Sequence, residues 1–168
     1  FGFNDKSFGG HGEYLTIPEN AAVTMMPDGL SFTEAAPITE GAHYAMNTIK
    51  AAKVEKGQQV MVYGATGAIG SAAVQLLKHF GAVVTAVGNT KNVELVKSLG
   101  ADTVIDYQTQ DFTKTDTRFR FIFDAVGKSS FKQCKPLLTD KGVYISTELG
   151  KNGENIFYAL FTPLFGGK

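Results

Sequence analysis

The sequence contains a single cysteine, Cys134, among its 168 residues. No disulfide can form within such a chain, and a cysteine-rich zinc site is excluded. A chain without a disulfide framework suits a reducing compartment, so we expect a cytoplasmic protein.

The chain has no excess of charge of either sign, because sixteen basic residues balance sixteen acidic ones. Surfaces that bind nucleic acid or anionic lipid usually show a basic excess. Long apolar runs are missing as well, since no stretch reaches the roughly eighteen apolar residues that a membrane-spanning helix needs. We therefore expect neither a nucleic-acid partner nor a membrane partner.

Short apolar runs alternate with stretches of helical periodicity along most of the chain. The alternation is typical of βαβ units and predicts an α/β fold with a doubly wound parallel sheet. Such a sheet binds ligands at the carboxyl ends of its strands, where the strand order reverses. The expected strands are 59–63, 82–88, 103–107, 119–127 and 142–148, and the expected helices are about 68–80, 92–98 and 129–138.

The first third of the chain carries weaker signals. Residues 12–18 alternate in polarity, which predicts a short strand. Ser31 and Glu34 have the spacing of a capping box, which marks the start of a helix. We expect a helical stretch near 34–36 and a second one over about 41–52.

Residues 60–82, VMVYGATGAIGSAAVQLLKHFGA, place three glycines between an expected strand and an expected helix. Backbone N–H groups at a helix N-terminus bind a diphosphate where no Cβ blocks the approach. Gly67 would permit that approach, and Gly70 would let the helix pack closely on the strand. Ala65 stands where the dinucleotide fingerprint has its first glycine, so the pattern is A-x-G-x-x-G preceded by Gly64. The alternative is a tight turn that binds no ligand.

The segment that follows the second expected strand has no acidic residue. A cofactor without a 2′-phosphate usually meets an acidic side chain there, about 20 residues after the glycines. No Asp or Glu occurs from Ser71 to Val93. The residues at that place are Asn89, Thr90 and Lys91. Two short polar donors and a cation suit a phosphate better than two hydroxyl groups, so we expect NADPH rather than NADH. The alternative is that Lys91 is a solvated lysine without a ligand.

The chain resembles the medium-chain dehydrogenase/reductase superfamily over nearly its whole length, and its quinone oxidoreductase-like, zinc-independent branch in particular. The resemblance is carried by GATGAIGSAAVQLLKHFGA, SLGADTVIDY and IFDAVG, with GEYLTIPENA and EGAHYAMNTI in the same order. It implies a GroES-like catalytic domain split around a Rossmann domain. Residues 1–30 would be a short remnant, the tail of the catalytic domain's first segment. Residues 31–168 would be the NAD(P)-binding Rossmann domain.

The chain begins with Phe and opens on a glycine-rich segment, so we expect a piece of a longer protein. By the resemblance, the Rossmann domain would be truncated before its last strand. That strand usually pairs across a dimer in this family, which implies a homodimer for the whole protein. A sheet edge would be left exposed at this end, together with Phe157, Leu160 and Phe161.

The resemblance also implies which residues contact the cofactor. It places Tyr107 at a position that often flanks the adenosine phosphate, Asp124 and the three residues after it beside the ribose, and Ser146 and Thr147 near the nicotinamide. The cofactor-binding residues that it implies are Ala65, Thr66, Gly67, Ala68 and Ile69 at the diphosphate, Asn89, Thr90 and Lys91 at the 2′-phosphate, and Tyr107, Ala125, Val126 and Gly127.

Zinc-dependent members of the superfamily carry a cysteine ligand just before the helix that precedes the nucleotide strand. The matching stretch here, PITEGAHYA, has no cysteine. Glu40 offers an oxygen ligand in its place, but one carboxylate without partners does not make a site. We therefore expect no zinc and no metal site. Cys134 lies far along the chain and is expected to be a small core or surface thiol.

His43 is the candidate catalytic residue, because it stands where relatives often have a threonine near the nicotinamide. An imidazole there would donate a proton to the oxygen of a reduced carbonyl or enone, since its ordinary pKa lies near neutrality. The alternative is a histidine that makes one structural hydrogen bond in its helix. Tyr44 is a further candidate, either for a pocket wall or for packing.

These features together imply an NADPH-dependent oxidoreductase that transfers hydride to a quinone, an enone or a carbonyl compound. A zinc-dependent alcohol dehydrogenase of the same superfamily and a non-catalytic NADPH-binding module are the alternatives. An S-adenosylmethionine-binding domain is less favoured, because it usually places an acidic residue at the end of the second strand. By itself the chain is expected to bind the dinucleotide weakly and to catalyse nothing.

Overall fold

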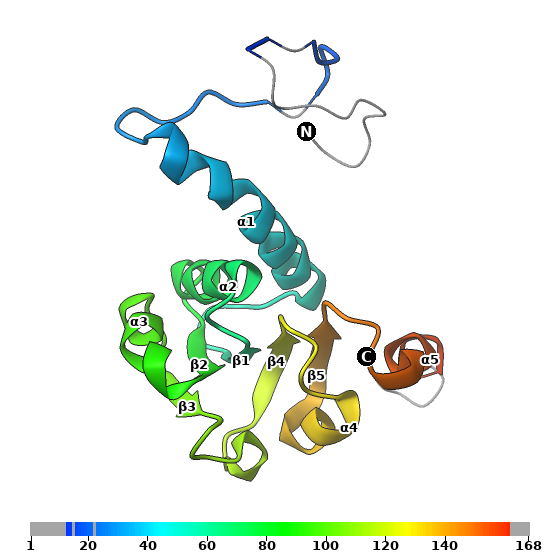
Figure 1. Ribbon diagram of the computed structural model, residues 1–168. Coiled ribbons are helices and arrows are strands. Elements are labelled where there is room, and N and C mark those ends of the chain that lie inside the picture. Colours follow the sequence, from blue (N-terminus) through cyan, green and yellow to red (C-terminus); the bar gives the residue numbers. More distant parts are fainter. Residues whose placement is uncertain (1–12, 15, 22, 162–168) are drawn as a thin grey trace. The chain divides into compact units, whose positions relative to one another are not determined.

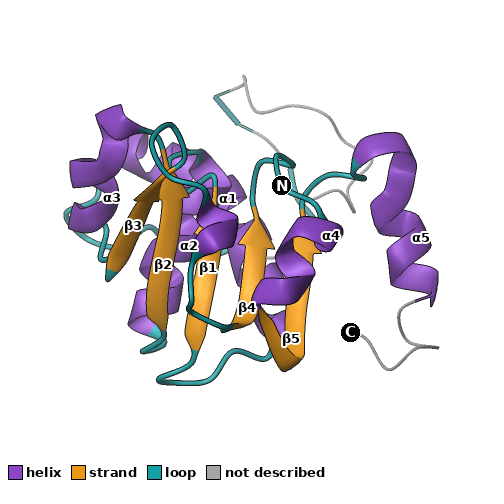
Figure 2. Ribbon diagram, turned by 90° about the horizontal axis from the view of Figure 1, so that it is seen from below, coloured by secondary structure: helices purple, strands orange, loops and turns teal. Residues whose placement is uncertain are grey.

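The computed structural model describes residues 13–14, 16–21 and 23–161. The chain divides into two compact units, Phe1–Ala35 and Ala36–Lys168. The second unit holds a five-stranded sheet in the order β3-β2-β1-β4-β5, and every neighbouring pair of strands is parallel. Figure 2 shows the strands side by side with their arrowheads at the same edge. The strands are β1 (Gln59–Tyr63), β2 (Val83–Gly88), β3 (Thr103–Asp106), β4 (Phe119–Asp124) and β5 (Leu138–Ser146).

Helices cover both faces of this sheet, which confirms the expected doubly wound α/β fold (Figure 1). One face packs against the longer helices before and after β1, and the other packs against short helical segments before and after β4. The helices are α1 (Phe32–Ala52), α2 (Ala68–His79), α3 (Val93–Ser98), α4 (Phe131–Cys134) and α5 (Glu154–Phe161), and the short 3-10 segments are η1 (Thr90–Asn92), η2 (Phe112–Lys114), η3 (Lys135–Leu137) and η4 (Lys151–Gly153).

The central strands are apolar on both faces because both faces are buried. β1 alternates Val60 and Val62 toward one face and Met61 toward the other, and all three side chains are fully buried. β4 contributes Phe121 and Ile122 to the two faces in the same way. A parallel sheet enclosed on both sides requires this continuous apolar pattern.

The capping box predicted at the start of α1 is confirmed. The amide of Glu34 donates to Ser31 Oγ (3.3 Å), and the amide of Ser31 donates to Glu34 Oε2 (3.0 Å). The hydrogen bonds from Ser31 also lower the pKa of the Glu34 carboxyl. Each partner satisfies a backbone donor that the first helical turn would otherwise leave free.

The expectation of two separate helices in this region is wrong, because α1 is one continuous helix that contains Pro37. Proline removes one backbone donor, and here it falls in the second turn. Beyond it, the buried stripe of Gly41, Ala45, Ile49 and Ala52 repeats at helical spacing and holds the rest of the helix together.

The strand expected over 12–18 is not formed by the described residues of that segment, which are 13, 14 and 16–18; residues 12 and 15 lie outside the described part. An alternating pattern makes a strand only where a neighbour supplies backbone partners. No described strand pairs with this segment, since the described sheet contains β1 to β5 alone.

The region after β4 differs from the expected long helix. Pro136 lies within η3, so that α4 ends at Cys134 and a 3-10 turn completes the segment. β5 then begins at Leu138, four positions earlier than expected, because Leu138 pairs with Phe119 across an irregularity in the register. At the far end of the described chain, Phe157, Leu160 and Phe161 of α5 are exposed, as expected.

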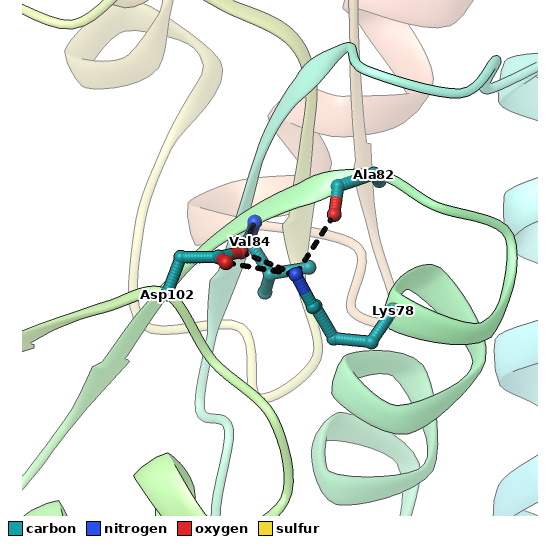
Figure 3. A network of polar contacts seen from close by, with 4 residues as sticks. All are labelled: Lys78, Ala82, Val84 and Asp102. Atoms are coloured by element: carbon teal, nitrogen blue, oxygen red, sulfur yellow. Dashed lines mark hydrogen bonds and ion pairs between the residues drawn. The ribbon is translucent and has the colours of Figure 1, made fainter.

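An ion pair closes the amino-terminal edge of the sheet (Figure 3). Lys78 Nζ lies 2.8 Å from both carboxylate oxygens of Asp102 and donates to the carbonyl of Ala82 at 3.3 Å. Asp102 Oδ2 also accepts the amide hydrogen of Val84 at 2.6 Å. These bonds tie the end of α2 to the starts of β2 and β3.

Asp102→Asn is expected to lower the free energy of unfolding by about 1 kcal/mol, because it removes the charged partner of a half-exposed ion pair. Urea denaturation at neutral pH measures the change. The matched control is Glu94→Gln, which breaks the exposed Glu94–Lys97 pair on α3 and should cost no more than about 0.5 kcal/mol. Equal losses in both variants would contradict the special role of Asp102.

The same pair predicts how stability depends on pH. Burial raises the pKa of Asp102, but the hydrogen bonds from Lys78 and Val84 outweigh it, so the folded-state pKa lies below the ordinary 3.8. The contribution is therefore complete above pH 3.8 and is lost as the pH falls through the lower folded-state value. The difference in stability between the natural chain and Asp102→Asn should shrink in that acid range. A difference that stays constant from neutral pH to pH 2 would contradict this assignment.

Candidate functional site

The carboxyl ends of all five strands meet at one edge of the sheet, because all are parallel. Five loops therefore gather at this edge, one after each strand. The strand order reverses between β1 and β4, since the chain runs from β1 outward through β2 and β3 and then returns to β4 on the other side. Open α/β sheets bind ligands at such a switch point.

The loops after β1 and β4 touch each other at this point. Gly64 has a positive φ of 80°, and a Cβ on it would lie 2.7 Å from Cγ1 of Val126. Only glycine fits both the backbone conformation and the space. The predicted glycine loop and the predicted ribose-side loop, Ala125–Gly127, are thus brought together.

The N-terminus of α2 presents unsatisfied backbone donors beside this junction. The first bond inside the helix runs from the amide of Ser71 to the carbonyl of Gly67 at 2.8 Å, so the amides of residues 68–70 precede the ladder. No side chain caps this end, and its first turn has no acidic residue. Thr66, Gly67 and Ala68 are exposed, so the donors border an open surface. This is the arrangement that binds an anion.

The three glycines between β1 and α2 lie in different local environments, and the fold does not require glycine at all three. A Cβ on Gly70 would overlap the carbonyl oxygen of Gly64, so Gly70 lets α2 pack directly on the end of β1, as predicted. Gly67 has a negative φ of −77°, and a Cβ there would meet nothing closer than Gly64 O at 3.8 Å. The fold therefore requires glycine at 64 and 70 but not at 67.

The other predicted diphosphate residues lie in different environments. Ala65 is fully buried, and its amide donates to the carbonyl of Val87 at 3.3 Å, so both its side chain and its N–H are engaged within the protein. Thr66 lies over the end of β2, with its methyl group 3.6 Å from where a Cβ on Gly88 would stand. Ile69 is half-buried and packs against the core.

α1 passes close to the same helix end. Gly41 is buried, and a Cβ on it would lie 2.6 Å from the carbonyl oxygen of Ala68. His43, two residues later, is exposed, and its Nε2 lies 3.0 Å from Nδ2 of Asn47. The imidazole therefore makes a local hydrogen bond within its helix, which is the alternative to a catalytic role. Tyr44 contacts it edge-on, with 5.8 Å between the rings.

The loops after β2 and β3 form a polar cluster. The hydroxyl of Thr90 donates to Asp106 Oδ2 at 2.5 Å, and the amide of Thr90 donates to Gln108 Oε1 at 3.2 Å. Asn92 Nδ2 donates to Asn89 Oδ1 at 2.9 Å. Lys91 is exposed and forms no ion pair with any described residue.

Asp106 is the residue that sequence reasoning missed here. The search for an acidic residue covered only the end of the second strand, whereas Asp106 ends the third. The signal was present, because neighbouring parallel strands bring their carboxyl ends together and β2 pairs directly with β3. Tyr107, which follows it, is 48% exposed and stacks on Tyr63 with ring centroids 6.3 Å apart.

The loop after β4 is built around a buried carboxylate. Asp124 is fully buried and accepts hydrogen bonds from the amides of Val126 (3.2 Å), Lys128 (3.3 Å) and Ser129 (2.8 Å). The hydroxyls of Ser129 and Tyr144 donate to the same carboxylate, at 2.8 and 3.3 Å. Asp124 thus fixes the shape of Ala125–Gly127 from within.

Burial has a clear effect on two groups next to Asp124. It raises the pKa of the Tyr144 hydroxyl to about 12 and that of the Cys134 thiol to about 11. Cys134 is therefore protonated at neutral pH and belongs to the core, which makes it an inert thiol.

The loop after the last strand contributes a carboxylate to the same edge. The side chain of Glu148 lies over Gly127, so a Cβ on Gly127 would overlap the Cγ atom of Glu148. Ser146 ends β5, and its Oγ accepts the amide hydrogen of Glu148 at 3.2 Å. Thr147 continues the alignment with β4, because its amide donates to the carbonyl of Asp124 at 3.0 Å.

Comparison with known proteins supports what the fold indicates. A family model described as zinc-binding dehydrogenase matches residues 68–166. The chain is 38% identical over 125 residues to 2-methylene-furan-3-one reductase from Solanum lycopersicum, which covers 73% of the chain and 32% of that protein. It is 31% identical over 148 residues to NADPH-dependent alkenal/one oxidoreductase, chloroplastic, from Arabidopsis thaliana, which covers 87% of the chain and 36% of that protein.

The solved structure of the quinone oxidoreductase from Coxiella burnetii is also similar, with a TM-score of 0.73 and 28% identity. The likeness covers 81% of this chain and 43% of that one. The chain belongs to the medium-chain dehydrogenase/reductase superfamily.

This member of the superfamily spans about a third of the length of the two curated relatives. The family model begins at the N-terminus of α2 and takes in the whole carboxyl edge of the sheet from β2 onward. The match therefore includes α2 and the loops after β2 to β5, while the glycine loop 64–67 lies just before it.

The family's name mentions zinc, but the described residues of this chain contain no group of three or more His, Cys, Asp or Glu that could hold a metal ion. Glu40 lies exposed in α1. The described part of the chain also has no helix that is both long and apolar enough to cross a bilayer.

The variant Gly67→Ala tests whether Gly67 is needed for binding a ligand or only for the turn before α2. The variant is expected to leave the free energy of unfolding unchanged or slightly raised, because the φ suits alanine and the space is open. Its affinity for a dinucleotide is expected to fall by about tenfold, because a Cβ would stand before the donors of α2. The matched control, Gly70→Ala, should destabilise the fold itself. Calorimetric titration and urea denaturation on the same samples measure both effects, and unchanged binding by Gly67→Ala would contradict the assignment.

Proposed function

We propose that the chain is the cofactor-binding part of an NADPH-dependent oxidoreductase that passes hydride to a quinone, an enone or a carbonyl compound. The observation that carries the proposal is Gly67, a glycine that the fold does not require, at the uncapped N-terminus of a helix. A diphosphate needs free backbone donors and no intervening Cβ, and this position offers both.

The relatives support the same class of reaction. One is named a reductase of a methylene-furanone, another an NADPH-dependent alkenal/one oxidoreductase, and the similar solved structure is a quinone oxidoreductase. A bound nicotinamide supplies the hydride, and the protein supplies binding, orientation and the exclusion of water. In this chain the loops after β1 and β4 would hold the dinucleotide across the switch point.

The preference for NADPH rests on the loop after β2. Lys91 is a cation without an ion-pair partner among the described residues, and Asn89 and Thr90 precede it. A 2′-phosphate gains from a cation and polar donors at this place, whereas a 2′-hydroxyl gains little from a cation.

Titration of the 168-residue chain with NADPH and, separately, with NADH tests the proposal. We expect weak but measurable binding and tighter binding of NADPH. Lys91→Ala should weaken NADPH binding by about tenfold and leave NADH binding unchanged, because it removes one charge-assisted contact. Lys97→Ala, on α3, is the matched control and should change neither affinity. Equal loss in both lysine variants would remove the phosphate assignment, and failure of a folded chain to bind either dinucleotide would remove the proposal.

We also propose His43 as the proton donor to the reduced substrate, from its place in α1 two residues after the contact between Gly41 and Ala68. In the whole protein, His43→Gln should lower turnover with a small enone and leave the affinity for NADPH unchanged, because the amide cannot deliver a proton. A variant with full turnover would return His43 to its structural bond with Asn47.

The remaining proposals concern the whole protein. We propose a homodimer without zinc, located in the cytoplasm, although the relative from Arabidopsis is named chloroplastic. Sedimentation, metal analysis and cell fractionation of the whole protein test these three points. A monomer, one zinc ion per chain, or protein in an organelle fraction would each overturn the corresponding point.

A further inference from the structure

The end of β3 brings a carboxylate to the place that the proposed function assigns to the 2′-phosphate. Asp106 accepts the hydroxyl hydrogen of Thr90 at Oδ2 (2.5 Å) and the amide hydrogen of Gln108 at Oδ1 (3.0 Å). Thr90 belongs to the loop after β2, and Gln108 to the loop after β3. Both carboxylate oxygens are thus engaged, and the one hydroxyl proton of Thr90 is already donated.

We propose that Asp106 is a specificity-determining residue that limits the preference of this chain for NADPH over NADH. The inference rests on the proposed function, because it assumes that a dinucleotide lies along this edge. It concerns the cofactor's 2′ substituent alone and is independent of the substrate.

The charge of Asp106 gives the first reason. The hydrogen bond from Thr90 lowers the pKa of the Asp106 carboxyl, so it is ionised at neutral pH. A phosphate monoester carries a charge of about −1.5 to −2 at that pH. A phosphate bound at the loop after β2 would be repelled by the like charge of Asp106 at the neighbouring end of β3, and this repulsion opposes the attraction that Lys91 provides.

The hydrogen-bonding capacity of the cluster gives the second reason. A phosphate oxygen needs a donor, but the one hydroxyl hydrogen of Thr90 already has two acceptors within the protein, Asp106 Oδ2 and Gln108 Oε1 (3.0 Å). A 2′-hydroxyl is itself a donor, and a carboxylate is the partner that it usually finds in cofactor sites of this architecture. Asp106 therefore favours NADH while Lys91 favours NADPH, so the preference of the natural chain for NADPH is smaller than Lys91 alone would give.

A purely structural role for Asp106 is the competing explanation, since its bonds also join two loops. Asp106→Asn distinguishes the two roles. The amide oxygen of asparagine still accepts the hydroxyl hydrogen of Thr90, so the bond between the two loops is kept while the charge is removed. The amide group cannot also accept from the backbone amide of Gln108, so only that bond within the loop after β3 is lost.

Asp111→Asn is the matched control. Asp111 also binds a threonine, because Oδ1 accepts from the amide of Thr113 (2.9 Å) and from its hydroxyl (2.7 Å). It is a loop aspartate with similar local chemistry that precedes η2. It lines a hollow together with Val83 and Thr103, at the starts of β2 and β3 rather than at their ends.

The experiment measures the dissociation constants of NADPH and NADH for the natural chain and both variants by calorimetry. Asp106→Asn should tighten NADPH binding by roughly fivefold, as expected for the loss of one nearby like charge in a solvated site, and should weaken or leave unchanged the binding of NADH. The ratio of the dissociation constant of NADH to that of NADPH should therefore rise in Asp106→Asn and stay at its natural value in Asp111→Asn.

The outcomes separate the inference from the function on which it rests. A ratio that Asp106→Asn does not change, or equal shifts for both cofactors, would overturn the inference and leave NADPH binding in place. A natural chain that is folded and binds neither cofactor would overturn the proposed function and the inference with it. A rise in the ratio that Asp111→Asn reproduces would also overturn the inference, because it would reflect the net charge of the chain rather than the site.

Discussion

The direct packing of α2 on the end of β1 is the constraint on which the rest of the structure depends. A Cβ on Gly70 would overlap the carbonyl oxygen of Gly64, so the helix can begin only where glycine allows contact between the two backbones. That contact places the free amides of the first turn beside the switch point. α1 approaches the same end of α2 closely at Gly41, where a Cβ would lie 2.6 Å from the carbonyl oxygen of Ala68. The fold and the position of the free amides at the start of α2 therefore follow from one close approach.

The two edges of the sheet serve different purposes. At the amino-terminal edge, Lys78 and Asp102 join α2, β2 and β3 through charge-assisted bonds. At the carboxyl edge, backbone donors of α2 remain unsatisfied and Lys91 has no ion-pair partner among the described residues. Unsatisfied groups at one edge are tolerated because the other edge and the two apolar faces supply the stability.

Much of this could be read from the sequence, because βαβ units have strong local signals. Alternating apolar runs and helical stretches located all five strands, and the capping box at Ser31 marked the start of α1. The errors arose where tertiary partners decide. Residues 12–18 have the pattern of a strand, but no described strand pairs with them. β5 begins four residues earlier than expected because Leu138 pairs with Phe119 of β4. The strand before the glycine loop and the helix after it were predicted correctly. The buried position of Ala65 was not predicted, since only the structure shows the bond from its amide to the carbonyl of Val87.

Asp106 shows most clearly what a search along the sequence omits. A rule that looks for an acidic residue at a fixed distance after the glycines considers spacing along the chain alone. The loops that follow neighbouring strands of a parallel sheet, however, lie side by side in space. β2 pairs with β3 in register from Thr85 to Gly88, so the residue opposite Gly88 is Asp106 itself. An acidic side chain at the end of β3 therefore reaches the loop after β2, as the hydrogen bond from Thr90 to Asp106 shows. For parallel sheets, cofactor preference is better argued from the strand order than from spacing, because the strand order decides which charges share a loop cluster.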